Sequence, residues 1–410
     1  MRHKRWASLL TLVAAAGGLA ACGSSHDGGS TGSSGSSGGG GAALKIALVP
    51  PTGGALEQLG KNAVRGWQYA AAEANAKGGI AGHKVEIVTS STDGQPNTTL
   101  RAVRKLVTQN GAKYVSGIVT SPEVGALQQQ LPALGALALL GDGQDDALTG
   151  ANCNANAFRA TQSASMLLAG FQQMLTKSKA QKWAIQAVDY STGHTAAKLF
   201  QTAAEKAGKK VVLVQFAPLG TTDFGSYISK IRASGADGFF GLVPSLDGVA
   251  FINQASQFKL FDTFKSVFSY NMVTEPNLPT LGAKTVGFLS NLGYDESSTN
   301  PMNKSFVAGF QKQFGGVPET VAADNYLAAQ LLFAGVKKAG SVDPQKVKAA
   351  LDGISFDSFV GPVTMGADHQ LVRPAYIAEV AKGGDGYVFK TVAAIPSSVT
   401  RPTPDQACKL

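Results

Sequence analysis

Short apolar segments alternate with longer amphipathic segments along most of the chain, and this alternation constrains the fold more than any other feature. Each short segment has the length of a buried strand, and each long segment repeats apolar residues at helical spacing. In the first part of the chain, the strand candidates are residues 45–50, 85–89, 114–119 and 137–140, and the helix candidates are residues 59–74, 96–107 and 122–131. This regular alternation predicts a parallel sheet that is covered by helices on both faces.

The same alternation begins again after Cys153. The strand candidates there are residues 183–188, 211–216 and 238–243, and the helix candidates are residues 165–177, 195–207, 224–233 and 246–258. We therefore expect an α/β protein with two lobes of similar build. Further helices are expected at 303–314, 323–339 and 344–351, followed by short strands and turns over 361–390.

The first 43 residues are expected to export and tether the chain. Residues 1–21 have a basic start, an apolar run too short to span a bilayer and then small residues, which is typical of a secretory signal peptide. The final letters LAAC, ending at Cys22, resemble the bacterial lipobox, which implies cleavage before Cys22 and lipidation of that residue; the alternative is an ordinary signal with a chance cysteine. Residues 22–43 are rich in Gly and Ser and predict a flexible tether. The protein is thus predicted to be extracytoplasmic, in the cell envelope, and attached to the membrane through its lipid anchor only.

The charge pattern argues against a nucleic-acid partner. The chain has 36 Lys and Arg against 27 Asp and Glu, a formal net charge of +9. The basic residues are scattered and accompany no aromatic stacking motif, whereas a nucleic-acid surface needs clustered positive charge. A generally solvated surface is the simpler interpretation.

Two cysteines remain once Cys22 is assigned to the anchor. An exported protein meets an oxidising environment, which favours disulfide formation. We therefore predict a disulfide between Cys153 and Cys408. The alternative is a pair of buried free thiols.

The chain lacks the common motifs of catalysis and cofactor binding. From Lys45 onward it contains no Walker A sequence, no HExxH or CxxC motif and no GxSxG nucleophile turn. The segment from Gly141 begins like a dinucleotide fingerprint, but Asp146 stands where the third glycine belongs. The histidines after the tether, His83, His194 and His369, are far apart in the sequence, so a metal site is not expected. We predict neither a cofactor nor a catalytic residue, and an extracytoplasmic hydrolase is disfavoured.

Four segments in order carry a resemblance to a known family. They run from ALVPPTGG to DGQP (residues 47–96), SGIVTSPEVGAL (116–127), VDYSTGHTAAKLF (188–200), and DNYLAAQLLFAGVKKAG (324–340) followed by FVGPVTMGADHQ (359–370). From Lys45 to about Lys390 the chain resembles the branched-chain-amino-acid type of periplasmic binding protein, the leucine/isoleucine/valine-binding-like substrate-binding lipoproteins of ABC importers.

The resemblance implies the type I periplasmic binding fold, in which two Rossmann-like lobes are joined by a hinge of three chain crossings. It places lobe 1 at 44–157 plus 293–357, lobe 2 at 158–292 plus 358–400, and a C-terminal tail at 401–410. A ligand bound in the cleft would shift the balance toward the closed state, which an importer recognises. The implied partners are an amino acid or a related amide or carboxylate, and the permease and ATPase subunits; a monomer is expected.

The resemblance also assigns ligand-binding residues in the first lobe. Ser121, with Thr120 beside it, falls on the serine that hydrogen-bonds a ligand carboxylate; the alternative is that Ser121 caps the helix begun by Pro122. The loop of Asp142, Gly143 and Gln144 matches a loop that gives backbone and threonine contacts, with Gln144 replacing the threonine.

In the second lobe the matching positions depart from the family pattern. Thr192 falls where the family often has a covering tyrosine, for which Tyr190 is a substitute or, alternatively, a residue packed against its own lobe. In the first lobe, Leu59 offers apolar surface, whereas Trp67 is expected in the core.

Asn271 falls where relatives that bind α-amino acids usually have a carboxylate for the ammonium. Asn is neutral, so either Glu275 supplies this charge or the ligand is an amide, a carboxylate or an aromatic acid. The predicted function is solute capture for import. A ligand-sensing module of a receptor system is the alternative.

Overall fold

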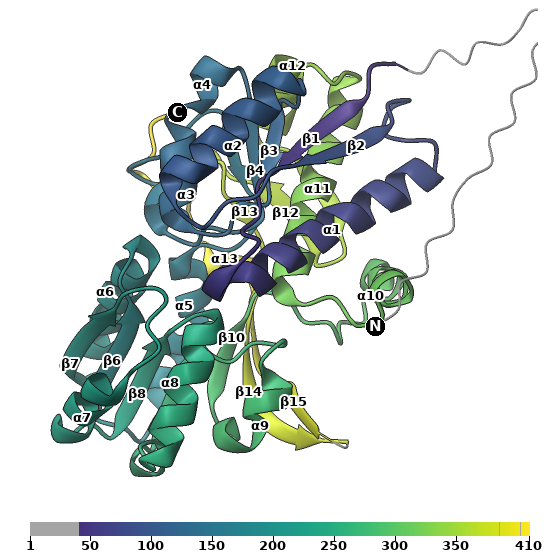
Figure 1. Ribbon diagram of the computed structural model, residues 1–410. Helices are drawn as coiled ribbons and strands as arrows, with labels where there is room; N and C mark the ends of the chain where they lie inside the picture. The colour runs from purple at the N-terminus through teal and green to yellow at the C-terminus, as the bar shows by residue number, and fades with distance from the viewer. Residues whose placement is uncertain (1–40, 385, 402) are drawn as a thin grey trace, which may run out of the picture. The chain divides into compact units, whose positions relative to one another are not determined.

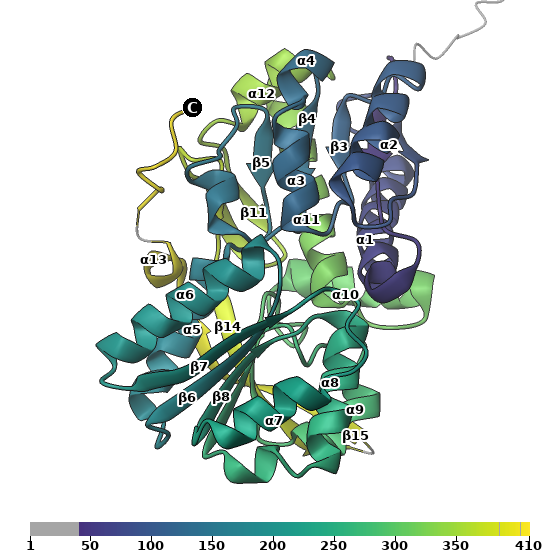
Figure 2. The ribbon, with the colours of Figure 1, turned by 60° about the vertical axis from the view of Figure 1, so that its left-hand side comes forward.

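The computed structural model describes residues 41–384, 386–401 and 403–410. Two sheets of mainly parallel strands, each with helices on both faces, form the two lobes (Figures 1 and 2). This architecture confirms the predicted α/β fold. No helix within the described residues is both long enough and apolar enough to cross a membrane.

The first lobe is built on a five-stranded parallel sheet with the order β2-β1-β3-β4-β5. Its strands are β1 (Leu44–Leu48), β2 (Val85–Thr89), β3 (Tyr114–Ser116), β4 (Leu137–Leu140) and β5 (Ala157–Arg159). The intervening helices are η1 (Gly54–Leu56), α1 (Glu57–Ala76), α2 (Pro96–Gln109), α3 (Ser121–Gln128), α4 (Leu131–Leu134) and η2 (Asp146–Thr149).

Strand β1 shows why this sheet is covered on both faces. Successive side chains of a strand point to opposite faces. Ile46 and Leu48 accordingly join the core with α1, whereas Ala47 and Val49 join the core with α2 and α3. Trp67 of α1 is fully buried, as expected, and its indole Nε1 donates to Ser116 Oγ at 2.9 Å.

The second lobe is built on a seven-stranded sheet with the order β15-β14-β10-β9-β8-β6-β7. Its strands are β6 (Lys182–Val188), β7 (Lys210–Ala217), β8 (Gly238–Leu242), β9 (Ser266–Ser269), β10 (Leu289–Leu292), β14 (Ala375–Gly383) and β15 (Gly386–Ile395). The helices are α5 (Ala164–Lys177), α6 (Ser191–Lys206), α7 (Gly225–Ala233), α8 (Ser245–Gln257), η3 (Phe261–Thr263) and α9 (Leu278–Thr285). Strands β6 to β10 are parallel, and the hairpin β14–β15 adds antiparallel strands at the β10 edge.

After β10 the chain returns to the first lobe. The returning elements are the helices α10 (Pro301–Phe314), α11 (Thr320–Ala339) and α12 (Pro344–Leu351) and a small sheet of β11 (Ser355–Ser358), β12 (Gly361–Met365) and β13 (Leu371–Val372). Val363, Met365 and Leu371 belong to the same apolar core as α1 and α11. The predicted change of lobe at residue 358 was therefore too early, because the chain leaves this core only after β13.

Three crossings join the lobes, between β5 and α5, between β10 and α10, and between β13 and β14. Buried polar side chains tie these crossings together. Gln162 Nε2 in the first crossing donates to Gly293 O in the second and to Pro374 O in the third, both at 2.9 Å. Arg373, fully buried in the third crossing, donates to Gly293 O and to Asp324 Oδ1 of α11, the latter at 2.5 Å. The hinge is thus a compact hydrogen-bonded junction.

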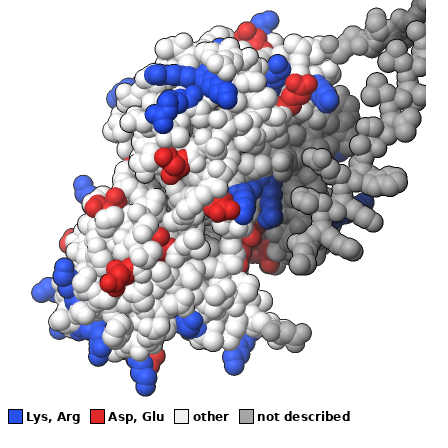
Figure 3. Space-filling view, viewed as in Figure 1, with Lys and Arg blue, Asp and Glu red and all other residues white. Residues whose placement is uncertain are grey.

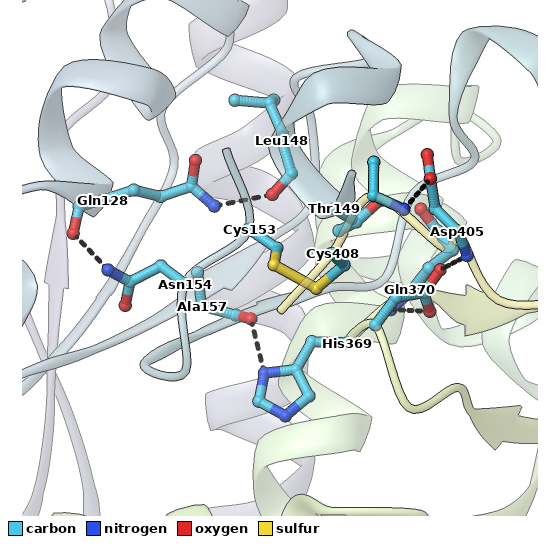
Figure 4. Close-up of a disulfide and its surroundings, with 12 residues drawn as sticks. Gln128, Leu148, Thr149, Cys153, Asn154, Ala157, His369, Gln370, Asp405 and Cys408 are labelled. Carbon is cyan, nitrogen blue, oxygen red and sulfur yellow. Dashed lines mark hydrogen bonds between the residues drawn. A yellow bond between two sulfur atoms is a disulfide. The ribbon is translucent and has the colours of Figure 1, made fainter. Parts of the chain in front are cut away.

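The C-terminal tail returns from the second lobe to the first. After the short helix α13 (Ser397–Thr400), Arg401 pairs with Asp368, and the Asp405 backbone N–H donates to the same carboxylate at 2.8 Å. The predicted disulfide is present: Cys408 is bonded to Cys153 in the loop after η2, with the two Cα atoms 5.4 Å apart (Figure 4). This bond adds a covalent link next to the hinge.

Candidate functional site

A cavity of about 590 Å³ lies between the two lobes. Its walls come from strand ends and helix starts of both sheets, the usual position of a ligand site in open α/β folds. The first lobe contributes Gln58, Leu59, Asn62, Val119, Ser121, Asp142, Gln144, Glu319, Thr320, Val321 and Asp324. The second lobe and the crossings contribute Leu167, Tyr190, Thr192, Leu242, Pro244, Ser245, Leu246, Val249, Asn271, Val273, Thr274, Glu275, Pro276, Asn277, Thr280, Asn291, Leu292 and Gly293.

Six of the eight predicted ligand-binding residues line this cavity. They are Ser121, Asp142, Gln144, Tyr190, Thr192 and Asn271. The apolar surface predicted for Leu59 is also part of the wall.

Ser121 and Thr192 meet across the cavity. Ser121 begins α3 in the first lobe and Thr192 lies in the first turn of α6 in the second. Their hydroxyl oxygens are 2.7 Å apart, and Ser121 Oγ also accepts the Asp145 backbone N–H at 3.1 Å. Thr195 Oγ1, one turn further along α6, donates to Asp145 Oδ1 at 3.0 Å. The Ser121–Thr192 and Thr195–Asp145 hydrogen bonds join the two lobes directly.

Gln144 forms a second link between the lobes. Its Oε1 accepts from Tyr270 Oη at 3.0 Å and from Asn271 Nδ2 at 2.9 Å. Asn271 in turn exchanges hydrogen bonds with Asn291, through its backbone N–H and its side chain. Asn271 has a positive φ of 51°, a conformation that Asn tolerates better than most residues. The Gln144 side chain, which is longer than the threonine of the family pattern, therefore reaches across the cleft.

Thr120 and Gly143 are the two predicted residues that do not line the cavity. Thr120 is the N-cap of α3, and its side chain forms a capping box with Glu123. The capping role proposed as an alternative for Ser121 thus belongs to its neighbour. Gly143 has a φ of +86°, a backbone conformation that favours glycine, and its carbonyl accepts from Arg159 Nη1 at 3.1 Å. Both residues shape the loops that hold Ser121 and Asp142.

Asp142 lies in the wall with one backbone N–H donor and, among the described residues, no cation paired with its carboxyl group. Its Oδ1 accepts the Gly143 backbone N–H at 2.8 Å. Burial, opposed by this hydrogen bond and reinforced by the nearby Asp324 and Glu123, raises the pKa of Asp142 to about 8. Burial also raises the pKa of Tyr190, and the nearby charge of Asp142 raises it further.

Two further carboxyls meet at the start of α11. Glu275 of the second lobe accepts from Thr320 Oγ1 at 2.6 Å and from the Thr320 backbone N–H at 3.2 Å. Glu319 accepts from Asn62 Nδ2 of α1, and burial together with the charge of Glu275 raises the pKa of Glu319 to about 7. Burial raises the pKa of Glu275 as well. Glu275 was considered from the sequence as an alternative to Asn271, whereas Glu319 was missed because only the returning chain brings α11 to the cleft.

The predictions for the signal peptide, for Cys22 and for most of the tether fall on residues 1–40, which lie outside the described residues.

Comparisons with known proteins agree on one family. A family model described as periplasmic binding protein matches residues 43–385. Leu/Ile/Val-binding protein homolog 7 of Brucella abortus is 25% identical over 339 residues, covering 79% of this chain and 84% of that relative.

Solved structures resemble the chain over most of its length. A solute-binding protein of an ABC transporter from Rhodopseudomonas palustris HaA2, in complex with p-hydroxybenzoic acid, has a TM-score of 0.80 and 25% identity, covering 87% of this chain and 97% of that one. The closed leucine-, isoleucine-, valine-, threonine- and alanine-binding protein of Brucella ovis has a TM-score of 0.78 and 20% identity, covering 90% and 98%.

Proposed function

Because the chain belongs to the periplasmic binding protein family, we propose that it is the extracytoplasmic solute-binding component of an ABC importer. It captures a small polar ligand between its lobes and presents the closed form to the permease and ATPase subunits. The observation that carries this proposal is the cavity of about 590 Å³ whose walls come from both lobes. A cavity of this size suits a small molecule and is enclosed only while the lobes are together.

Hinge closure is the mechanism that this arrangement supports. The hydrogen bonds Ser121–Thr192, Gln144–Asn271 and Glu275–Thr320 each join the two lobes, so all three belong to the closed form. A ligand that contacts both walls adds further interactions to that form alone. Its binding therefore shifts the population from open to closed, without any covalent chemistry.

The amino-terminal segment supplies the attachment in this proposal. A diacylated or triacylated Cys22 holds the protein at the membrane, since one acyl chain alone anchors only weakly. Residues 23–43 then act as a Gly- and Ser-rich leash. The mass of the mature protein tests this arrangement: an acylated N-terminus at Cys22 is expected, and a Cys22→Ser variant should be released from the membrane.

A thermal-shift screen of the native protein against amino acids, amides, amines and small carboxylates tests ligand capture. A ligand at a hundred times its Kd stabilises the protein by about 2.7 kcal/mol. Small-angle scattering on the best compound should show compaction. A panel that produces neither stabilisation nor compaction would contradict ligand capture by closure.

A pair of serine variants connects the screen to the cavity. Ser121→Ala removes a hydroxyl at the interlobe contact and should weaken ligand binding. Ser305→Ala removes an exposed hydroxyl on α10, bonded only to Pro301 O among the described residues, and should leave binding unchanged. Equal affinity in the two variants would remove Ser121 from the site.

A further inference from the structure

The charged residues that line the cavity are all acidic. Among the described residues of the wall, four are carboxylates and none is Lys, Arg or His. One of the four, Asp324, is paired with the buried Arg373. The remaining three, Asp142, Glu275 and Glu319, are not paired with a cation within hydrogen-bonding distance in the described part of the chain.

Two of these three carboxylates, Asp142 and Glu275, keep an oxygen available for a ligand. Asp142 accepts the Gly143 backbone N–H through Oδ1, Glu275 accepts from Thr320 through Oε1, and Glu319 accepts from Asn62 through Oε2. Among the hydrogen bonds of the described residues, none reaches the second oxygen of Asp142 or of Glu275. The wall therefore presents unused carboxyl oxygens, which become negatively charged acceptors when the carboxyls lose their protons.

The acidity of the cavity does not follow from the composition of the chain. The whole chain has a formal net charge of +9. Figure 3 shows Lys and Arg side chains scattered over the visible face of the molecule, with fewer Asp and Glu side chains between them. The charged residues of the cavity wall are thus acidic, whereas the chain as a whole has a positive net charge.

An anionic ligand fits this wall poorly. Ser121, the residue that the family resemblance assigns to a carboxylate, already bonds to Thr192 and to the Asp145 backbone N–H. A buried anion would face three carboxyls and no lining cation, and an uncompensated buried charge is costly.

Two kinds of cation also fit poorly. No group of three or more described His, Cys, Asp and Glu residues is arranged to hold a metal ion. Quaternary ammonium ions are usually held in cages of several aromatic rings, whereas Tyr190 is the one aromatic residue among the described residues of the wall. Carboxylate oxygens are best matched by N–H donors that carry positive charge.

We infer that the natural ligand of this cavity carries a net positive charge on nitrogen atoms that bear hydrogens, as in an organic ammonium, amidinium or guanidinium ion. This inference rests on the proposed function and assigns the ligand class of the same cavity. The aliphatic part of the wall, which includes Leu59, Leu242, Leu246, Val273 and Leu292, provides room for a short hydrocarbon body. The ligand is thus a cation with an aliphatic chain.

Calorimetric titration of the native protein with five probes tests the ligand class. The cations are 1,5-diaminopentane and agmatine, the zwitterion is leucine, the anion is benzoate and the neutral probe is hexanamide. At pH 8 and low salt, at least one cation should bind about tenfold or more tightly than leucine, benzoate and hexanamide, because charge-assisted hydrogen bonds are strong in a buried site.

Matched charge variants locate the effect. Asp142→Asn and Glu319→Gln keep the side-chain shape and remove the charge, and each should weaken cation binding about tenfold or more. Asp357→Asn removes an exposed carboxylate on β11 and should leave it unchanged. Thermal unfolding establishes that each variant is folded. For the unmodified protein, weaker cation binding at higher salt gives an independent readout.

The possible outcomes separate this inference from the proposed function. If leucine, benzoate or hexanamide binds and the cations do not, the assignment of the ligand class is overturned while solute capture stands. If no probe and no member of the wider screen binds, both are overturned. Cation binding that is unaffected by Asp142→Asn and by Glu319→Gln also overturns the assignment.

Discussion

Replacing Arg373 by Met should destabilise the protein strongly, because this side chain organises the hinge. The guanidinium is fully buried and donates to Asp324 Oδ1, to Gly293 O and, at 3.5 Å, to Ala160 O. The variant leaves the Asp324 carboxylate buried with Thr161 Oγ1 as its remaining side-chain donor. Removing one partner of a buried ion pair costs about 3–5 kcal/mol.

Urea unfolding followed by circular dichroism, with the disulfide intact and no ligand added, measures this loss. Lys265→Met is the matched control, because Lys265 is exposed and its pair with the half-buried Asp237 should contribute less than about 1 kcal/mol. Adding Asp324→Asn to Arg373→Met removes the orphaned charge, so the double variant should be more stable than the single one. A loss for Arg373→Met as small as that for Lys265→Met would refute the view that this ion pair holds the hinge.

Three further perturbations have defined outcomes. Reducing the disulfide should lower the free energy of unfolding by roughly 3–5 kcal/mol, because the closed loop is long; an unchanged urea midpoint would contradict this. The pKa values of Asp142 and Glu319 are raised to about 8 and about 7, so the folded state holds protons that the unfolded chain releases. The unliganded protein should therefore lose stability as the pH rises from about 5 to 8. In the Asp142→Asn variant the melting temperature should depend less on pH. A melting temperature that rises over this range would contradict the reasoning. Gly193→Ala would place a methyl group 1.9 Å from the Val188 carbonyl oxygen, so it should displace the start of α6 and weaken ligand binding, whereas wild-type affinity would show that the helix start can shift without harm.

The sequence was sufficient to predict the layered fold because its signals are local. Ile46 and Leu48 alternate with Ala47 and Val49, and both sets are apolar, as a strand covered on both faces requires. The glycines after α1 adopt positive φ at Gly78 and Gly79, as expected where a helix ends. Such features depend on neighbours in the sequence and can be read from it directly.

The cavity was only partly predictable because its chemistry depends on distant contacts. Glu319 and Asn62 are 257 residues apart, and Glu275 meets Thr320 across 45 residues. No short pattern marks such pairs, so the acidic character of the wall was visible only once the lobes were assembled. The family resemblance pointed to Ser121, which lines the cavity, but it could not show that the Ser121 hydroxyl contacts Thr192.

The position of the disulfide sets the order in which the exported chain can mature. Cys408 follows Cys153 by 255 residues, so Cys153 can acquire its native partner only after this long stretch of the polypeptide has emerged. During that delay Cys22 is the only other thiol in the chain, and a thioether-linked lipid on its sulfur would remove it as a competing partner. Early acylation would in this way protect the pairing of the other two cysteines.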